Sequence, residues 1–173
     1  MNLRNLIYFF AVLILPFLEL ITPSWLKIGG MAPLWSVLLL LPIAIESGSL
    51  IGVIIGFYFG LILDGMSLGG PSHLPALVIL GFLWGRLSEK DEPIDLILNL
   101  GLLAWIGALI FGFSLWIQNI FFHNLISFSL FNSWALYTLL AQAIITALLA
   151  PIVCSWVLLL LRKSKIRPKT WKN

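Results

Sequence analysis

Residues 32–63 read APLWSVLLLLPIAIESGSLIGVIIGFYFGLIL, an apolar run in which the only charged residue is Glu46, near the centre. About 20 apolar residues cross a hydrocarbon core of about 30 Å, so this run is too long for one membrane span. The polar tetrapeptide Glu46-Ser47-Gly48-Ser49 lies where a tight turn would divide it. We therefore predict two short spans, Pro33–Ile45 and Leu50–Leu63, that form a hairpin.

The composition of the whole chain places this hairpin in a membrane protein. Of 173 residues, 61% are hydrophobic and only 10% are charged, and the mean hydropathy is +1.07. Soluble domains carry about 25% charged residues, and disordered chains combine low hydropathy with high net charge, so both classes are excluded. The single cysteine, Cys154, cannot form an internal disulfide.

Four more apolar segments complete the predicted topology. The first has no small-residue cleavage pattern after it, so we interpret it as a retained span and not as a signal peptide. The expected fold is an all-α integral membrane protein, with a six-helix transmembrane domain over residues 1–161 and a basic cytoplasmic tail over 162–173. The additional spans are Leu6 to about Trp25, Leu74–Leu87, Leu96–Trp116 and Trp134–Leu161.

The distribution of basic residues predicts the orientation, because Lys and Arg accumulate in cytoplasmic loops. With six spans, Lys27 is the one base on the outer side. Both termini are then cytoplasmic. The short spans fit a bilayer if they tilt little, if interfacial residues extend them, or if the lipid around them is thinner. The bases on the inner side are Arg4, Arg86, Lys90, Arg162, Lys163, Lys165, Arg167, Lys169 and Lys172.

Three carboxylates lie in or beside the predicted spans, where ionisable groups are costly and often functional. Glu19 shares a helical face with Tyr8 and Leu15, and we expect this face to point into the bundle. The Glu19 carboxylate is then either a buried group for coupling or ligand binding, or an interfacial acid that reaches the outer headgroups. Glu46 is expected to cap the helix that follows it. Asp64 either accepts N–H bonds from the loop near residues 66–68, which contains Gly69 and Gly70, or binds a partner's cation.

No pattern of catalytic or metal-binding residues is evident. His73 and His123 are the only histidines, and neither has a second His or Cys at metal-ligand spacing. Phosphate loops, nucleophile elbows and kinase motifs are absent from the sequence. We therefore predict a protein that is not an enzyme and has no metal, cofactor or nucleic-acid site.

Small residues recur at fixed spacing in two predicted spans. Gly52, Gly56 and Gly60 follow one another every four residues, as do Gly81 and Gly85. Such stripes allow two helix backbones to approach closely within lipid. They serve either internal packing or the docking of a partner's transmembrane helix; we expect the first at Gly60 and the second at Gly52.

The predicted outer loop 119–133 is uncharged and rich in phenylalanine. It is expected to lie in the membrane interface, flanked by Trp116 and Trp134, or to form an aromatic surface for an extracytoplasmic partner.

One stretch of the chain resembles a known family. Gly52-x3-Gly56-x3-Gly60-Leu61-x2-Asp64, then Leu68-Gly69-Gly70-x3-Leu74 and Gly81-x3-Gly85-Arg86, is similar to the rod shape-determining protein MreD family. The preceding Ala32-Pro33-Leu34-Trp35 and the basic tail also resemble that family. The chain departs from the family pattern at Gly70-Pro71-Ser72-His73 and in loop 119–133.

The resemblance implies a non-enzymatic scaffold of the bacterial inner membrane in the cell-elongation machinery, which builds sidewall peptidoglycan. Its implied partners are an MreC-like bitopic protein, membrane lipids and, indirectly, an MreB-like filament and cell-wall synthesis enzymes. The family is similar in fold to the substrate-binding S-components of energy-coupling-factor vitamin transporters, which supplies an alternative function. Those subunits carry an Ala-x3-Ala stripe on the first helix, where this chain has Ala11 alone. A lipid-modifying enzyme is a third, less favoured possibility.

Overall fold

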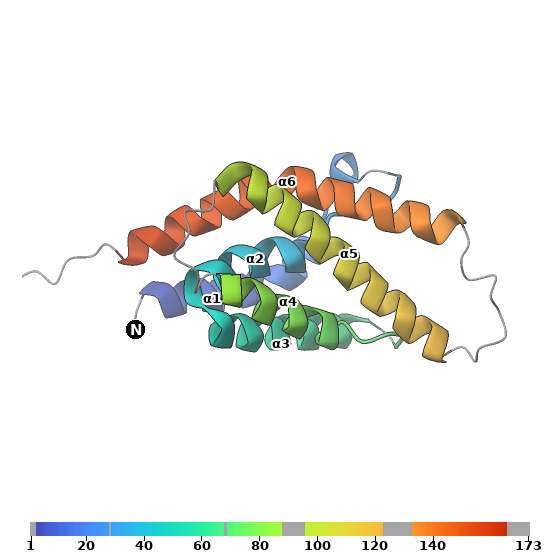
Figure 1. Cartoon of the computed structure of the whole chain (residues 1–173), viewed down its shortest axis with the longest axis horizontal. Coiled ribbons are helices and arrows are strands. Elements are labelled where there is room, and N and C mark those ends of the chain that lie inside the picture. Colours follow the sequence, from blue (N-terminus) through green and yellow to red (C-terminus); the bar gives the residue numbers. More distant parts are fainter. Residues whose placement is uncertain (1–2, 28, 68, 88–95, 123–132, 166–173) are drawn as a thin grey trace, which may run out of the picture.

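A computed structural model describes residues 3–27, 29–67, 69–87, 96–122 and 133–165 of the chain (Figure 1). These residues form an all-α bundle with one short 3-10 turn, η1, at Ser24–Leu26. The helices are α1 (Leu3–Leu20), α2 (Trp35–Ser47), α3 (Ser49–Met66), α4 (Leu74–Leu87), α5 (Leu96–Phe122) and α6 (Ser133–Lys165).

Three of these helices contain stretches long and apolar enough to cross a membrane: Ser49–Met66, Asn99–Phe121 and Leu136–Lys163. The other helices contribute shorter apolar segments, at Leu6–Leu20, Trp35–Ser47 and Leu74–Leu87. The chain therefore has the helices of a multi-pass membrane protein.

The helix ends differ from several predicted boundaries. The predicted bounds of α4 are confirmed, but α1 ends at Leu20 and α5 continues to Phe122. The first four residues of the predicted loop 119–133 are therefore helical, and residues 123–132 lie outside the described part of the chain. Likewise, α6 continues through the start of the predicted tail to Lys165, and residues 166–173 are not among those described.

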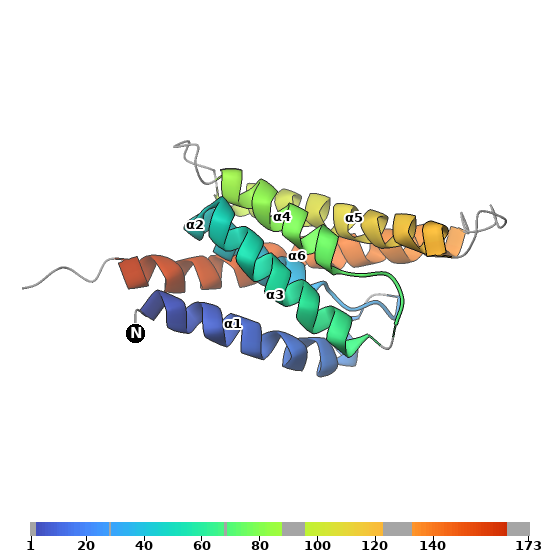
Figure 2. The same cartoon turned by 90° about the horizontal axis from the view of Figure 1, so that it is seen from below.

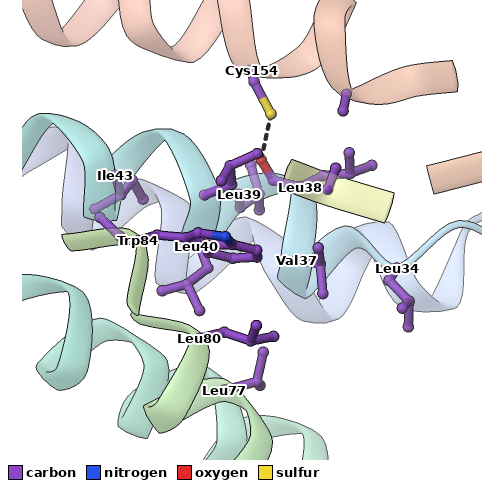
Figure 3. Packing of buried hydrophobic residues seen from close by; sticks show 14 of the residues in the cluster. Leu34, Val37, Leu38, Leu39, Leu40, Ile43, Leu77, Leu80, Trp84 and Cys154 are labelled. Carbon is purple, nitrogen blue, oxygen red and sulfur yellow. Dashed lines mark hydrogen bonds between the residues drawn. The ribbon is translucent and has the colours of Figure 1, made fainter. Parts of the chain in front are cut away.

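Helix α2 lies at the centre of the bundle and contacts every other helix (Figures 1 and 2). Residues 36–44 of α2 are all buried, because α4 covers one side of this helix and α6 another. In Figure 3, Leu77, Leu80 and Trp84 of α4 lie on one side of α2. On another side, the Cys154 thiol of α6 donates a hydrogen bond to the Leu38 carbonyl oxygen at 3.3 Å.

Polar contacts mark the two ends of the bundle, which we call the inner end and the outer end. The inner end holds the start of α1, the α2–α3 turn and the end of α6. The outer end holds the α3–α4 connection, the last turns of α5 and the start of α2. The marking contacts are Tyr8 to Ser47 and Arg162 to Glu46 at the inner end, and Asp64 to Ser72 and Ser72 to Gln118 at the outer end.

Candidate functional site

The glycine stripes of α3 and α4 face each other in an antiparallel hairpin, the most extensively packed pair of helices among the described residues. A Cβ atom at Gly52 would overlap the carbonyl oxygen of Gly81, and one at Gly81 would overlap that of Gly52. A Cβ at Gly85 would overlap the backbone of Ser49. Backbone therefore meets backbone along the crossing, and any side chain at these positions would separate the helices.

The remaining glycines of the α3 stripe meet leucines of α4. A Cβ at Gly56 would overlap the carbonyl oxygen of Leu77, and a Cβ at Gly60 would lie 2.6 Å from the Cα of Leu74. Internal packing is thus confirmed for Gly60. The expectation that Gly52 faces a partner is wrong, because the antiparallel register aligns Gly52 with Gly81 inside the hairpin.

A cluster that we call the polar clasp joins α3, α4 and α5 at the outer end. It consists of Asp64, Ser72, His73 and Gln118. Asp64 Oδ2 accepts a hydrogen bond from the Ser72 hydroxyl at 2.5 Å. Asp64 Oδ1 accepts from the His73 backbone N–H at 2.6 Å and lies 2.8 Å from His73 Nδ1. One carboxylate therefore fixes the start of α4 to the end of α3.

The donors to Asp64 are not those that the sequence predicted. The backbone N–H of Ser67 donates to the carbonyl oxygen of Leu63, so it continues the bonding of α3. Gly69 and Gly70 follow with φ angles of 103° and 128°, in the region that side chains other than glycine rarely adopt. These glycines turn the chain so that Ser72 and His73 reach the carboxylate. Leu68 of the predicted segment lies outside the described residues.

Gln118 of α5 holds the clasp from the other side. Its Oε1 accepts from the Ser72 N–H at 2.7 Å, and its Nε2 donates to the Ser72 carbonyl at 2.8 Å. The His73 ring lies against the ring of Phe111, with their centroids 5.6 Å apart. The side chains of Asp64 and His73 are only 26% and 22% exposed. The hydrogen bonds of the clasp therefore join three helices.

A second polar group surrounds the start of α2, where the first N–H groups of a helix lack partners within it. The Leu34 N–H donates to the Thr146 hydroxyl of α6 at 3.1 Å. The Glu19 carboxylate accepts from the Ser36 backbone N–H. Glu19 thus acts as a cap supplied by another helix, and the favourable interaction of a carboxylate with a helix N-terminus accounts for its position.

The face of α1 that was expected to point inward does so. Leu15 is fully buried, and the Tyr8 hydroxyl shares a hydrogen bond with the Ser47 hydroxyl at the inner end. Glu19 is partly buried on the same face. The Ser36 hydroxyl is buried beside this region and has no hydrogen-bond partner within the described part of the chain.

Glu46 lies in the last turn of α2, just before α3, and its role as a cap of α3 stays a prediction. The residue directly before α3 is Gly48, with φ of 88°. Glu46 Oε2 lies 3.5 Å from Arg162 Nε, and the side chains of Glu46 and Arg162 are 13% and 50% exposed. The pair joins the α2–α3 turn to α6, and its exposure makes it a weak contact.

Several of these residues carried no sequence signal for their role. Ser72, Gln118 and Thr146 are ordinary polar residues in the sequence, and they meet partners 8, 46 and 112 positions away. The one hint in the sequence to the roles of Gln118 and Thr146 is their position inside apolar helices, because a polar side chain within lipid is stabilised when it finds a hydrogen-bond partner.

The hydrogen bonds of these residues join helices to one another. Over the described ranges, no group of three or more His, Cys, Asp or Glu side chains could hold a metal ion. Comparison with protein-family models, with curated proteins and with solved structures gives no match.

Proposed function

We propose that the chain is a six-span protein of a bacterial inner membrane with both termini in the cytoplasm. The inner end of the bundle carries exposed Arg86, Arg162 and Lys163, whereas Lys27 follows α1 at the other end. This arrangement supports the orientation derived from the basic residues.

Within that membrane, the protein acts as a non-enzymatic scaffold of the cell-elongation machinery, as the resemblance to the MreD family implies. The observation that carries the proposal is the hairpin made by residues 52–86, the segment on which the resemblance rests. Its glycines set a close crossing, and Asp64 ties its two helices together at the outer end. A rigid hairpin of this kind suits a protein that positions other membrane proteins.

The placement of the polar groups also favours a scaffold. Val37, Leu38, Leu40 and Leu41 fill the centre of the bundle and are fully buried. Asp64 and His73 use their hydrogen bonds to join helices. A catalytic or transport role would require such groups to face a substrate instead.

The proposed partners are those that the resemblance implies. An MreC-like bitopic protein is the direct partner, and an MreB-like filament and cell-wall synthesis enzymes are linked through it. The glycine stripes of α3 and α4 are occupied by each other. A partner helix would therefore contact the larger apolar side chains that the bundle exposes.

The alternative, a substrate-binding subunit of a vitamin transporter, gains no specific support. Its resemblance rests on a small-residue stripe on the first helix that meets a coupling protein. Ala11, the one alanine of α1, is only 8% exposed and packs in the core of the bundle.

Affinity purification of the whole protein in mild detergent tests the proposal. We expect an MreC-like single-span protein and peptidoglycan-synthesis proteins to co-purify. The Gly65→Leu variant controls for the general effect of a larger side chain on α3. The space beside Gly65 is open, so this variant should retain these partners. Recovery of an ATPase with a membrane coupling subunit would support the transporter alternative and contradict the scaffold.

A further inference from the structure

The Glu19 carboxyl group has no cationic partner among the described side chains. The ion pairs in the described part of the chain are made by two other acids, Asp64 and Glu46. Glu19 lies one residue before the end of α1 and is partly buried. Its hydrogen-bond donor in the described part of the chain is the backbone N–H of Ser36, at the start of α2.

A negative charge on Glu19 would be poorly compensated at this position. Removal of a carboxylate from water is costly, and the cost is offset only by an opposite charge together with several hydrogen bonds. One N–H at the start of a helix returns a small part of it. A neutral carboxyl group avoids the cost, and its carbonyl oxygen still accepts a hydrogen bond from the Ser36 N–H. The capping of α2 therefore does not require a charged Glu19.

A neutral carboxyl group needs an acceptor for its O–H, and the Ser36 side chain offers one. Ser36 is fully buried, and among the described residues its Oγ is the buried side-chain polar atom without a hydrogen-bond partner. The same residue donates its backbone N–H to Glu19. Bond lengths keep Oγ within about 4 Å of that nitrogen. The unpartnered hydroxyl therefore lies beside the Glu19 carboxyl group.

The polar side chains that neighbour these two residues in the sequence already have partners. Trp35 Nε1 donates to Thr22 Oγ1 at 2.9 Å, and Thr22 Oγ1 donates to the Leu18 carbonyl oxygen at 2.7 Å. The hydroxyl of Thr22 thus both accepts and donates. The remaining match at the start of α2 is between the Glu19 carboxyl group and the Ser36 hydroxyl.

Helices α2, α3 and α6 pack against α1, and none of their described side chains forms an ion pair with Glu19. Asp64 of α3 is bonded within the polar clasp. Lys27, which follows α1, is exposed. The other charged or titratable groups on these helices lie at the inner end, are exposed or are bonded elsewhere; they are Glu46, Tyr58, Tyr137, Cys154, Arg162 and Lys163.

We propose that Glu19 is a proton-binding site whose O–H donates to Ser36 Oγ while its carbonyl oxygen accepts from the Ser36 N–H. Binding converts the carboxylate to a carboxylic acid at neutral pH, and release returns the proton to water at the outer end of the bundle. Because release leaves an unpaired, partly buried charge, a rise in pH weakens the contact between α1 and α2. The site is independent of the proposed scaffold role.

Infrared spectroscopy of the whole protein in an ester-free detergent tests the proposal. A protonated carboxyl group has a carbonyl stretch that lies apart from the carboxylate and amide bands. At neutral pH we expect such a band, which Glu19→Gln removes. Glu46→Gln is the matched control and should leave the band unchanged, since Glu46 pairs with Arg162. In Ser36→Ala the band should move to higher frequency, because the O–H loses its acceptor.

The wild-type spectrum is decisive even without the variants, since the band must disappear reversibly as the pH is raised. Absence of the band at neutral pH would overturn the proposal, because Glu19 would then be ionised and the Ser36 hydroxyl would donate to it. A band that Glu19→Gln does not remove would overturn it as well. A band that keeps its frequency in Ser36→Ala would overturn Ser36 as the acceptor.

Thermal unfolding in the same detergent provides a second measurement. The amide of Glu19→Gln can donate to Ser36 Oγ and accept from the Ser36 N–H at any pH. From neutral to alkaline pH, the unfolding midpoint of the wild type should therefore fall further than that of Glu19→Gln. Equal falls for the two proteins would contradict proton binding at Glu19.

Discussion

Gly52 and Gly81 meet backbone to backbone, each so close that a Cβ on one would overlap the carbonyl oxygen of the other. The contact lies near the inner end of an antiparallel hairpin, about one helical turn from the point where Gly85 similarly meets Ser49. Packing of this kind is the main source of helix association where lipid removes the hydrophobic driving force.

Replacement of Gly52 with alanine should therefore destabilise the isolated protein. The added methyl group is forced against backbone that cannot move aside, and overpacking costs about 1 to 3 kcal/mol. We expect a lower midpoint of thermal unfolding in detergent. Gly65→Ala is the control, because the space around Gly65 is open and alanine favours a helix by about 1 kcal/mol over glycine. Equal midpoints for the two variants would show that the glycine contact is not tight.

The polar clasp predicts a graded response at Asp64. Asp64→Ala removes the acceptor for Ser72 and His73, and hydrogen bonds to charged groups contribute about 1.5 to 3 kcal/mol. Asp64→Asn keeps one acceptor oxygen and should lose less. The free energy of unfolding, measured by denaturant titration in detergent, should fall in the order wild type, Asn, Ala. A larger loss for Asn than for Ala would contradict the clasp.

The bond from the Leu34 N–H to Thr146 is buried and should be sensitive to loss of the hydroxyl group. Thr146→Val keeps the shape but leaves the N–H without its acceptor, at a cost of about 1 to 3 kcal/mol. Thr146→Ser retains the hydroxyl and should restore most of that stability apart from its missing methyl group. If valine and serine variants unfold at the same denaturant concentration, the bond does not stabilise the start of α2.

Topology provides an independent prediction. A reporter enzyme fused after Asn173 should be active in the cytoplasm, and one inserted at Gly70 should be active outside it. An insertion within residues 89–92 should report a cytoplasmic position and serves as an internal control. An external reporter after Asn173 would contradict the six-span arrangement.

The sequence was informative where a local pattern determines the outcome. The bounds of α4 follow from an apolar segment between a glycine-rich loop and a charged segment, and the inward face of α1 follows from helical periodicity. The close approach of α3 and α4 follows from their glycine spacing. Each of these features depends on residues within one or two turns of a helix.

The sequence was less informative where a partner comes from elsewhere in the chain. The face occupied by Gly52 depends on the register between α3 and α4, which glycine spacing does not determine. The end of α5 was placed at Trp116 instead of Phe122, because the apolar composition of this helix continues past the thickness of a bilayer. Gln118 and Thr146 could not be assigned, since their partners are brought to them only by the packing of whole helices.

The proposed role in cell elongation is tested most directly by depleting the protein from the cells that produce it and measuring cell shape. We predict that rods become spheres, and that expression of the wild-type chain or of the Gly65→Leu control restores rods. A stably inserted variant that no longer binds the MreC-like partner should fail to restore them. Rods that keep their shape after depletion while vitamin uptake is lost would contradict the scaffold and support the transport alternative.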